Sequence, residues 1–389
     1  MKLAYLYPEH LGKSPARILQ VAATCRALAA SGVELHFICG RFKGLDDRLA
    51  ELGIRAVNGL RVHPVAMWQP GPGLRVPFSW GRVYERAAWR ELRTLAGQGV
   101  RAALVRHLKL AAYLLPRAEA LGLPLLYEAH ELFAQTAAEE GLAPAKVANL
   151  EAMEDRVLRQ ASRVLAISRP LASALEGRGV RGPVAVAPSG VDDSFFALDD
   201  RRREPGLAAY AGGLGAWKGV DLLLEAAAKA PAVRVEVLGG QEGGPDWLRL
   251  SRLAKGLDLG GRLVMRPRAG QDAVKELLAR AGVAVWPGSG RQRISAEFTS
   301  PLKLFEYLAA GCAVAAPRLP AAQSVLTHGE NALLFAPDDA ASLAQALTRL
   351  VERPQEARSL ARAGRELARG YTWRARAMVI KQAAEEAAA

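Results

Sequence analysis

The sequence predicts an α/β protein made of two doubly wound, parallel-sheet domains. Short apolar runs alternate with helical patterns along the whole chain, which is typical of parallel β-α-β units. The alternation occurs twice, and a turn-rich segment over 188–196, followed by a charged run over 199–204, separates the two sets. The chain has 389 residues, 50% of them hydrophobic, so each half is long enough to bury a core of its own.

The candidate strands are short apolar runs, and helical patterns fill most of the gaps between them. In the first half the runs lie at 3–7, 34–39, 102–106, 125–128, 164–167 and 184–187. In the second half they lie at 207–211, 234–238, 263–266, 283–286, 313–316 and 332–335. The first helix is expected to start at Ser14 and Pro15 and to end at Gly32, with its apolar face on Ile18, Val21, Cys25 and Leu28.

These patterns place an N-terminal Rossmann-like domain at 1–190 and a second one at 191–370. Doubly wound folds bind ligands outside the carboxyl ends of their strands, so we expect a ligand in a cleft between the two domains. The loop that contains Gly12 follows the first strand and is a candidate ligand loop. It carries one glycine and no GxGxxG fingerprint, which argues against an ordinary dinucleotide site.

Composition favours a reduced, cytoplasmic protein that holds no metal. Three dispersed cysteines form neither a disulfide framework nor a metal-ligand spacing. The apolar run after Met1 is too short for a signal peptide, and no run approaches the roughly 18 apolar residues of a membrane span. Acidic pairs occur in turns or at helix starts, where capping is the expected role, at Asp46, Asp192, Asp199 and Asp338.

The net charge of +13 is uneven, because residues 1–190 carry +9 of it. A basic half is compatible with nucleic acid, anionic lipid or an acidic substrate, and equally with an arginine-rich solvated surface. No nucleic-acid-binding motif accompanies the charge, so nucleic acid is not the expected partner.

The segment 299–311 reads as a loop that turns into a helix. Ser300 is expected to be the N-cap, Pro301 the first helical residue, and Gly311 the end of the segment. The N–H groups of Leu302 and Lys303 would then point out of the helix end, which suits a phosphate. Glu306 lies further along and could accept hydrogen bonds from a ribose diol. The alternative is a capped amphipathic helix with a purely structural role.

The segment 210–221 follows the first strand of the second domain. Its glycines, including Gly212 and Gly213, let a backbone approach a ligand closely, and Lys218 is placed to neutralise a phosphate.

Four stretches together resemble the retaining glycosyltransferases of family 4, which have the two-domain GT-B fold. They are 127–132 (YEAHEL), 187–192 (APSGVD), 212–221 (GGLGAWKGVD) and 300–311 (SPLKLFEYLAAG). The resemblance covers nearly the whole chain and extends to 371–373, which in such enzymes leads a helix, here 371–389, back onto the N-terminal domain. It implies sugar transfer from a nucleotide diphosphate sugar, a UDP- or GDP-sugar being expected, with retention and without a required metal or other cofactor.

The resemblance also implies roles for individual residues. Lys218 would bind the diphosphate, the N–H groups of Leu302 and Lys303 would cradle it, and Glu306 would hold the ribose. Arg268 would meet the base through its backbone. His130 would face the donor sugar, where a neutral imidazole could orient a hydroxyl or stabilise positive charge on the ring. Its structural alternative is a capping or core histidine.

Two positions depart from the family pattern. Gly213 stands where many members carry an arginine, and Phe298 stands where the first glutamate of a Glu-x7-Glu pair is expected, with Glu297 one place away. We hypothesise that Arg291 or Arg293 supplies the missing positive charge.

A stripe of aromatic and basic residues over 67–93 suggests an acceptor side near a membrane. It includes Arg82, Arg86, Arg90 and Arg93 at helical spacing, with Arg75 and the aromatic residues Trp68, Phe78, Trp80, Tyr84 and Trp89 nearby. Such a stripe could rest on anionic lipid at the inner face of the membrane, or be a solvated face with its aromatics inward.

Taken together, these features predict a cytoplasmic glycosyltransferase that uses a nucleotide sugar. It is expected to act in cell-surface polysaccharide, lipopolysaccharide or glycolipid assembly. Its expected catalytic residues are His130, Lys218 and Glu306, and its acceptor is a glycan or a lipid-linked glycan. The alternatives are a nucleotide-sugar epimerase or a phosphorylase on the same fold, and a non-catalytic subunit that binds the nucleotide sugar.

Overall fold

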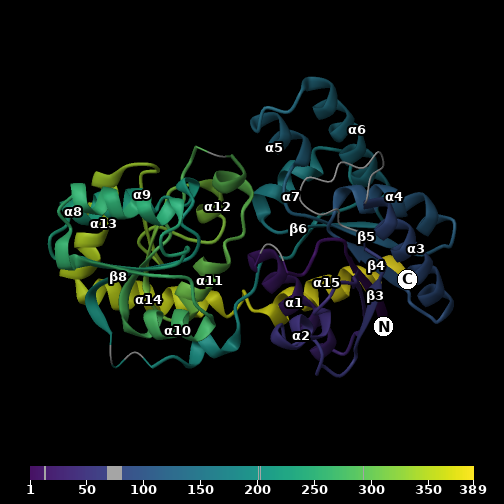
Figure 1. Cartoon of the computed structure of the whole chain (residues 1–389), viewed down its shortest axis with the longest axis horizontal. Helices are drawn as coiled ribbons and strands as arrows, with labels where there is room; N and C mark the ends of the chain where they lie inside the picture. The colour runs from purple at the N-terminus through teal and green to yellow at the C-terminus, as the bar shows by residue number, and fades with distance from the viewer. Residues whose placement is uncertain (13–14, 68–80, 200, 202, 292) are drawn as a thin grey trace. The chain divides into compact units, whose positions relative to one another are not determined.

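A computed structural model describes residues 1–12, 15–67, 81–199, 201, 203–291 and 293–389 (Figure 1). The chain forms two compact units: Met1–Pro188 together with Trp373–Ala389, here called unit 1, and Ser189–Thr372, here called unit 2. Each unit contains one parallel sheet with helices packed against it. The predicted fold class, two doubly wound α/β domains, is therefore confirmed.

Unit 1 contains a seven-stranded sheet of order β3-β2-β1-β4-β5-β6-β7, and its paired strands are parallel. The strands are β1 (Lys2–Tyr7), β2 (Glu34–Gly40), β3 (Leu60–Val65), β4 (Ala102–Val105), β5 (Leu125–Ala129), β6 (Arg163–Ala166) and β7 (Ala185–Val186). The helices are α1 (Pro15–Ala30), α2 (Leu45–Glu51), α3 (Gly81–Gly97), α4 (Leu108–Glu119), α5 (Phe133–Glu139), α6 (Pro144–Gln160), α7 (Arg169–Glu176) and α15 (Trp373–Ala388).

The last helix, α15, completes the core of unit 1. Its residues Ala377, Ile380, Ala383 and Ala384 are buried in one cluster with Ile18, Val21, Cys25 and Leu28 of α1. The four α1 residues are the apolar face that the sequence predicts. Because these apolar faces cover each other, the two ends of the chain depend on each other for burial.

Unit 2 contains a six-stranded sheet of order β10-β9-β8-β11-β12-β13, and its paired strands are also parallel. The strands are β8 (Glu204–Ala211), β9 (Arg234–Leu238), β10 (Leu263–Arg266), β11 (Ala281–Val285), β12 (Ala313–Pro317) and β13 (Leu333–Phe335). The α-helices are α8 (Val220–Lys229), α9 (Pro245–Gly256), α10 (Gln271–Arg280), α11 (Leu302–Ala309), α12 (Pro320–Gln323), α13 (Ala340–Glu352) and α14 (Pro354–Ala368).

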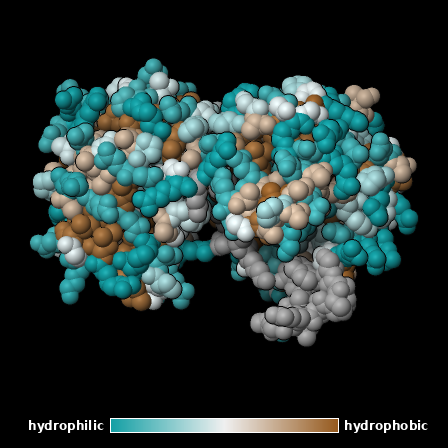
Figure 2. Space-filling model, turned by 90° about the horizontal axis from the view of Figure 1, so that it is seen from above, coloured by the Kyte–Doolittle hydropathy of each residue, from teal (hydrophilic) through white to brown (hydrophobic). Residues whose placement is uncertain are grey.

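Two features of the fold differ from the sequence analysis. Strand β3 was not expected, because Arg61, His63 and Pro64 interrupt its apolar pattern; it lies at the edge of the sheet, where a proline costs no inner ladder bond. The segment expected as a linker belongs mostly to unit 2, since Phe195 is fully buried in the core of that unit. Elsewhere hydrophilic side chains cover most of the face that Figure 2 shows.

The strand orders locate the ligand-binding edge of each sheet. In unit 1 the order reverses between β1 and β4, and in unit 2 it reverses between β8 and β11. Ligands of doubly wound sheets bind at the carboxyl ends of the strands beside such a reversal. The loops after β1 and β8 are therefore the candidate ligand-binding loops.

Candidate functional site

The loop after β8 is held close to its neighbours by glycines. Gly219 has a φ of +73°, and a Cβ on it would lie 1.9 Å from the carbonyl oxygen of Pro287. A Cβ on Gly239, which follows β9, would lie 1.8 Å from the carbonyl oxygen of Gly212. Neither position has room for a side chain. These close approaches fix the backbone of 212–219 against the ends of β9 and β11.

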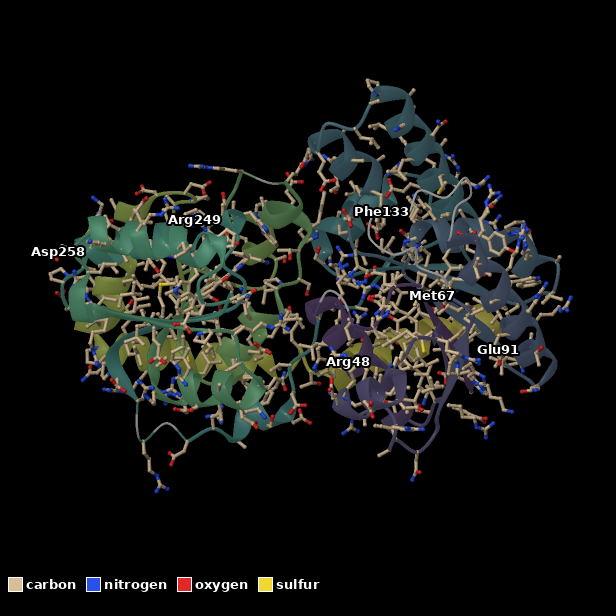
Figure 3. The ribbon with its side chains drawn as sticks, viewed as in Figure 1. Arg48, Met67, Glu91, Phe133, Arg249 and Asp258 are labelled. Atoms are coloured by element: carbon tan, nitrogen blue, oxygen red, sulfur yellow. The ribbon has the colours of Figure 1, made fainter. Side chains whose placement is uncertain are left out.

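Arg249 of α9, labelled in Figure 3, holds the same loop through two contacts. Its Nη2 donates to the carbonyl oxygen of Leu214 over 2.8 Å, and its Nη1 forms an ion pair with Asp221 at the start of α8. The loop is therefore tied at both of its ends, so the side chains that it carries start from fixed positions.

Two lysines flank the paired glycines of this loop. Lys218 ends a short 3₁₀ turn (Ala216–Lys218), and its Nζ lies 3.3 Å from the centroid of the Trp217 ring. Lys303, in the first turn of α11, donates from Nζ to the hydroxyl of Tyr210 over 3.0 Å. A Cβ on Gly213 would lie 4.0 Å from Cε of Lys218, and one on Gly212 would lie 2.2 Å from Nζ of Lys303.

Both ammonium groups have lowered pKa values. Burial lowers the pKa of Lys218 to about 7, and repulsion from Lys303 adds to the shift. Burial also lowers the pKa of Lys303 to about 8, against a smaller opposite effect of Glu306. Neither lysine forms an ion pair with a carboxylate in the described part of the chain. The loop thus holds two cations that lack a fixed counter-charge.

The start of α11 differs from the prediction. The helix runs from Leu302 to Ala309 with Pro301 at the N-cap position, so the expectations that Ser300 is the N-cap and that Pro301 is the first helical residue are wrong. The Oγ of Ser300 instead accepts from the backbone N–H of Ser189 over 2.9 Å, and the Ser189 hydroxyl donates back to the Ser300 carbonyl. A partner distant in sequence outcompetes the local cap.

The N–H groups at this helix end remain available for a ligand. As the first two helical residues, Leu302 and Lys303 have no intrahelical acceptor, and neither donates to another carbonyl among the residues that the structure describes. Gly311, with a φ of +74°, follows the helix as expected. The helix end and the two lysines carry positive charge into the same region.

Glu306 lies one turn beyond Lys303 on α11. Burial raises the pKa of Glu306 to about 7, and Lys303 opposes the rise. Its carboxylate makes no hydrogen bond or ion pair within the described ranges. An oxygen acceptor without a protein partner therefore lies close to the positive helix end.

Of three other proposed donor-binding residues, Arg268 and Arg293 are partly engaged within unit 2 and Arg291 lines a cavity. The N–H of Arg268 donates to the carbonyl oxygen of Gly240 over 2.9 Å, which leaves its carbonyl oxygen for a base. Arg293 is paired with Glu297, from Nε to Oε2 over 2.8 Å. Arg291 lines a cavity of about 410 Å³ together with Trp217, Asp221, Glu225 and Asp338. Among the described residues, neither arginine comes within 4 Å of a Cβ built on Gly213.

Phe298 stands where the Glu-x7-Glu pattern expects a glutamate. It lies in a single π-helical turn, Ile294–Phe298, shortly before α11. Phe298 is buried, whereas Glu297 is half-buried and faces Arg293. A π turn holds one residue more than an α turn, so the displacement of Glu297 by one place coincides with a local change of helical register.

In unit 1, both ring nitrogens of His130 are bonded within the protein. Nη2 of Arg106 donates to Nδ1 over 3.2 Å, and Nε2 lies 2.9 Å from Oε1 of Glu128. A guanidinium only donates, so Nδ1 is the unprotonated nitrogen and Nε2 carries the proton. Burial and the charge of Arg106 lower the pKa of His130 to about 4. The imidazole is therefore neutral, as the prediction for it requires.

Glu128, at the end of β5, is fully buried together with a partner from α15. Arg376 donates to the Oε1 of Glu128, to the carbonyl oxygens of Ala187 and Pro188, and to the Oγ1 of Thr24. Burial alone would raise the pKa of Glu128, but Arg376 and His130 outweigh it and hold that pKa far below its ordinary value. The C-terminal helix thereby fixes the group that orients His130.

The loop after β1 is folded on itself. The N–H of Gly12 donates to Nδ1 of His10 over 3.0 Å, and Nε of Arg48, labelled in Figure 3, donates to the Leu11 carbonyl over 3.1 Å. The Gly12 N–H is thus already used. Its role in donor binding stays a prediction.

The basic stripe is partly described. Arg82, Arg86, Arg90 and Arg93 are exposed on α3, opposite the buried Tyr84, Ala88, Leu92 and Leu95. Trp68, Arg75, Phe78 and Trp80 lie outside the described residues. Among the helices that the structure describes, none combines the length and the apolarity that crossing a bilayer requires.

Four residues of these clusters were not singled out in the sequence. They are the Lys303 side chain, Tyr210, Arg106 and Arg376. Arg106 ends a predicted strand and Lys303 lies inside a motif, but the neighbouring sequence does not indicate which residues their side chains contact.

Asp192 caps the turn that follows it, as expected, by accepting from the Ser194 N–H over 3.0 Å. No group of three metal-ligating side chains is found in the ranges described above.

Family comparisons agree with the two-unit organisation. Residues 20–195 match the family described as glycosyltransferase family 4, and residues 195–367 match the glycosyl transferases group 1. D-inositol 3-phosphate glycosyltransferase of Mycolicibacterium paratuberculosis is 28% identical over 268 residues, 64% of this chain and 58% of that protein. An exopolysaccharide phosphotransferase of Streptomyces coelicolor is 32% identical over 170 residues, 42% of this chain and 17% of the relative. The chain thus spans less than two thirds of these relatives.

Solved structures share the fold along almost the whole chain. Sucrose-phosphate synthase from Thermosynechococcus elongatus has a TM-score of 0.74 at 18% identity, covering 99% of this chain and 98% of that one. Anabaena HepE in complex with UDP has a TM-score of 0.73 at 17% identity, with 99% of each chain covered. At such identities the likeness establishes the fold alone.

Proposed function

This chain belongs to the group 1 glycosyl transferases of family 4, a family of enzymes, and we propose that it transfers a sugar from a nucleotide diphosphate sugar to an acceptor hydroxyl. Unit 2 binds the donor in this proposal. The alternatives of an epimerase or a phosphorylase share the donor chemistry and differ in the product.

The observation that carries the proposal is the pair Lys218 and Lys303 at the carboxyl end of β8. Two cations without an acidic partner, beside the open N–H groups of Leu302 and Lys303, suit a ligand with several negative oxygens. Glu306 adds an acceptor for hydroxyl groups close by. A diphosphate attached to a ribose satisfies both requirements.

The proposed reaction proceeds with retention. The bond between the anomeric carbon and the diphosphate oxygen breaks, and a bond to the acceptor oxygen forms on the same face of the sugar. The acceptor proton passes to the leaving diphosphate oxygen, so atoms and charge balance. Lys218 and the helix end stabilise the negative charge that develops on the leaving group, and they supply the largest contribution to catalysis. No metal is needed in this account.

His130 has a narrower role here than a free imidazole would have. Because Arg106 and Glu128 occupy its two nitrogens, a hydrogen bond to a sugar hydroxyl must replace one of them. Its neutral ring would not repel the positive charge that develops on the sugar ring during transfer.

The donor is proposed to be a UDP- or GDP-sugar and the acceptor a cell-surface glycan or a lipid-linked glycan. Solved structures of HepE contain UDP and UDP-glucose, and another neighbour is the lipopolysaccharide outer core galactosyltransferase WaaB. The exposed arginines of α3 would hold the enzyme at an anionic inner membrane face, each contributing about 1 kcal/mol. Flotation with liposomes that shows no salt-sensitive binding would remove the membrane part.

A second candidate is a non-catalytic subunit that binds nucleotide sugar. The absence of a side chain at Gly213 and the burial of Phe298 favour it, because both depart from the family pattern of donor contacts.

Acceptor-dependent release of nucleoside diphosphate tests the proposal. The protein is incubated with UDP- and GDP-sugars, with and without a bacterial lipid and polysaccharide extract, and the released diphosphate is measured. Release that requires the extract and is lost in Lys218→Ala supports transfer. Binding without release under any condition supports the non-catalytic subunit, and a changed sugar on an intact nucleotide supports an epimerase. A retained anomer in the product, read by NMR, tests retention.

A further inference from the structure

The Lys303 side chain lies on the backbone of the loop after β8. A Cβ added to Gly212 would meet Nζ of Lys303 at 2.2 Å and its Cε at 2.9 Å. The glycine therefore makes the space in which the ammonium lies. This contact joins two positions that are 91 residues apart in the chain, and it brings a cation to the residue directly before Gly213.

Tyr210 holds this ammonium in place. The hydroxyl of Tyr210 accepts from Lys303 Nζ over 3.0 Å and donates to the Gly213 carbonyl over 2.6 Å. The ammonium also lies 4.4 Å from the centroid of the Tyr210 ring. An ammonium has three donors, and Tyr210 uses one of them. The hydrogen bonds thus fix the side chain and still leave donors for a ligand.

A structural role does not account for the charge of Lys303. Lys2 is paired with Glu34 and Lys275 with Asp272, and Lys255, which has no acidic partner among the described residues, is exposed to solvent. Lys303 is only partly exposed and has no carboxylate partner in the described part of the chain, and it lies close enough to Lys218 for its charge to help lower the pKa of that ammonium. Such an arrangement is characteristic of a binding site, because a bound anion attracts both ammonium groups and offsets their mutual repulsion.

We propose that the ammonium of Lys303 is the second diphosphate-binding cation of this chain, acting with Lys218 beside the paired glycines Gly212 and Gly213. The inference rests on the proposed function and deepens it by naming a residue. It also replaces Arg293 as the source of the charge, since Arg293 is paired with Glu297, and it does not depend on Arg291, which lines a cavity beside Trp217 and Gly219 of the same loop. Tyr210 is then a positioning residue.

The first test is the affinity of Lys303→Met for inorganic pyrophosphate, UDP and GDP, measured by calorimetry. Loss of one charge-assisted contact should weaken all three ligands by about ten- to hundredfold. Lys218→Met should behave alike, and Lys255→Met, which removes an exposed lysine of α9, should bind as the wild type does. Equal binding by Lys303→Met and wild type would overturn the inference while leaving the proposed function intact.

A rescue experiment separates the charge of Lys303 from its packing. A Cβ on Gly213 meets only Cε of Lys218, at 4.0 Å, so a side chain can begin there without a clash at its first atom. Adding Gly213→Arg to Lys303→Met should recover at least about tenfold in affinity, because a cation returns to the same loop. No recovery, with both proteins folded and Lys303→Met weakened, would assign the loss to packing and contradict the inference.

Two other results, a Lys303→Met variant that does not fold and a wild type that does not bind, also have defined meanings. If Lys303→Met does not fold, Tyr210→Phe replaces it: removing the hydroxyl frees the ammonium and should weaken pyrophosphate by about three- to tenfold, and an unchanged affinity would overturn the inference. If the wild type binds neither UDP, GDP nor pyrophosphate, the proposed function itself fails, and that result is distinct from a failure of Lys303 alone.

Discussion

Arg106 donates a hydrogen bond to Nδ1 of His130 over 3.2 Å, and this bond fixes the protonation state of the imidazole. The opposite nitrogen donates to Glu128, whose carboxylate is held in turn by Arg376. His130, the candidate catalytic histidine, is therefore one end of a buried hydrogen-bond network. The network runs through Glu128 to Arg376 of the C-terminal helix. Its chemistry depends on residues far from it in sequence.

This bond predicts a pH dependence of stability. The unfolded chain protonates His130 below about pH 6.5, whereas the folded chain does so only near pH 4. The unfolded state binds more protons in that window, so the free energy of unfolding should fall by about 3 kcal/mol as the pH drops from 6.5 to 4. Urea titrations across this range should show a shallower fall in His130→Asn. Parallel curves for the two proteins would contradict the assigned protonation state.

Removal of Arg376 should destabilise unit 1 strongly. Glu128 is 0% exposed and Arg376 3% exposed, so Arg376→Ala leaves a buried carboxylate without its main partner. Breaking a buried pair in this way costs about 3–5 kcal/mol. Arg374→Ala, an exposed change on the same helix, is the matched control. Thermal unfolding that shifts equally little in both variants would show that the network contributes nothing.

Glu306→Ala should weaken ribose-containing ligands selectively. If the carboxylate accepts from the ribose diol, UDP and GDP lose about tenfold in affinity and pyrophosphate loses nothing. A 2′,3′-dideoxynucleoside diphosphate should bind wild type and variant alike. Glu276→Ala, an exposed carboxylate of α10, serves as the control. A matching loss for pyrophosphate would show that Glu306 acts on the cations instead.

Donor binding should weaken as the pH rises. The pKa values of Lys218 and Lys303 are near 7 and 8, so both lose their protons as the pH rises from 7 to 9. A nucleoside diphosphate, whose phosphate pKa lies near 6, keeps its charge over that range. Calorimetry should therefore show at least about a tenfold loss of affinity between pH 7 and 9, and a smaller one in Lys303→Arg. An affinity that is independent of pH would argue against the two ammonium groups.

Much of the fold could be predicted because it depends on local pattern. Apolar runs mark strands whether or not their neighbours are known, and the face of α1 repeats at helical spacing. Strand β3 was missed because its side chains at Arg61 and His63 are polar and Pro64 is unfavourable in most strands. These residues are tolerated at the edge of the sheet. Whether a strand lies at the edge or in the middle of its sheet depends on its pairing partners, which its own residues do not specify.

The site could be predicted only to the level of its loops. Lys218 and Glu306 lie in short motifs and were identified there. The contacts that decide their chemistry join distant positions: Ser300 binds Ser189, 111 residues away, and Arg376 binds Glu128, 248 residues away. A local capping rule failed at Ser300 for the same reason that the role of the Lys303 side chain was missed, since each of these side chains is placed by tertiary packing.

Stabilisation of the whole chain by a nucleoside diphosphate is the decisive measurement for the proposed donor site of unit 2. Thermal unfolding of the whole chain is followed with UDP, GDP, ADP and dTDP, in wild type, Lys218→Ala and Lys255→Ala. A ligand that binds only the folded state raises its stability by about 2.7 kcal/mol at a hundred times its Kd. We predict a rise in melting temperature with one nucleotide, retained in Lys255→Ala and lost in Lys218→Ala. No rise with any nucleotide would contradict the claim that this chain uses a nucleotide sugar.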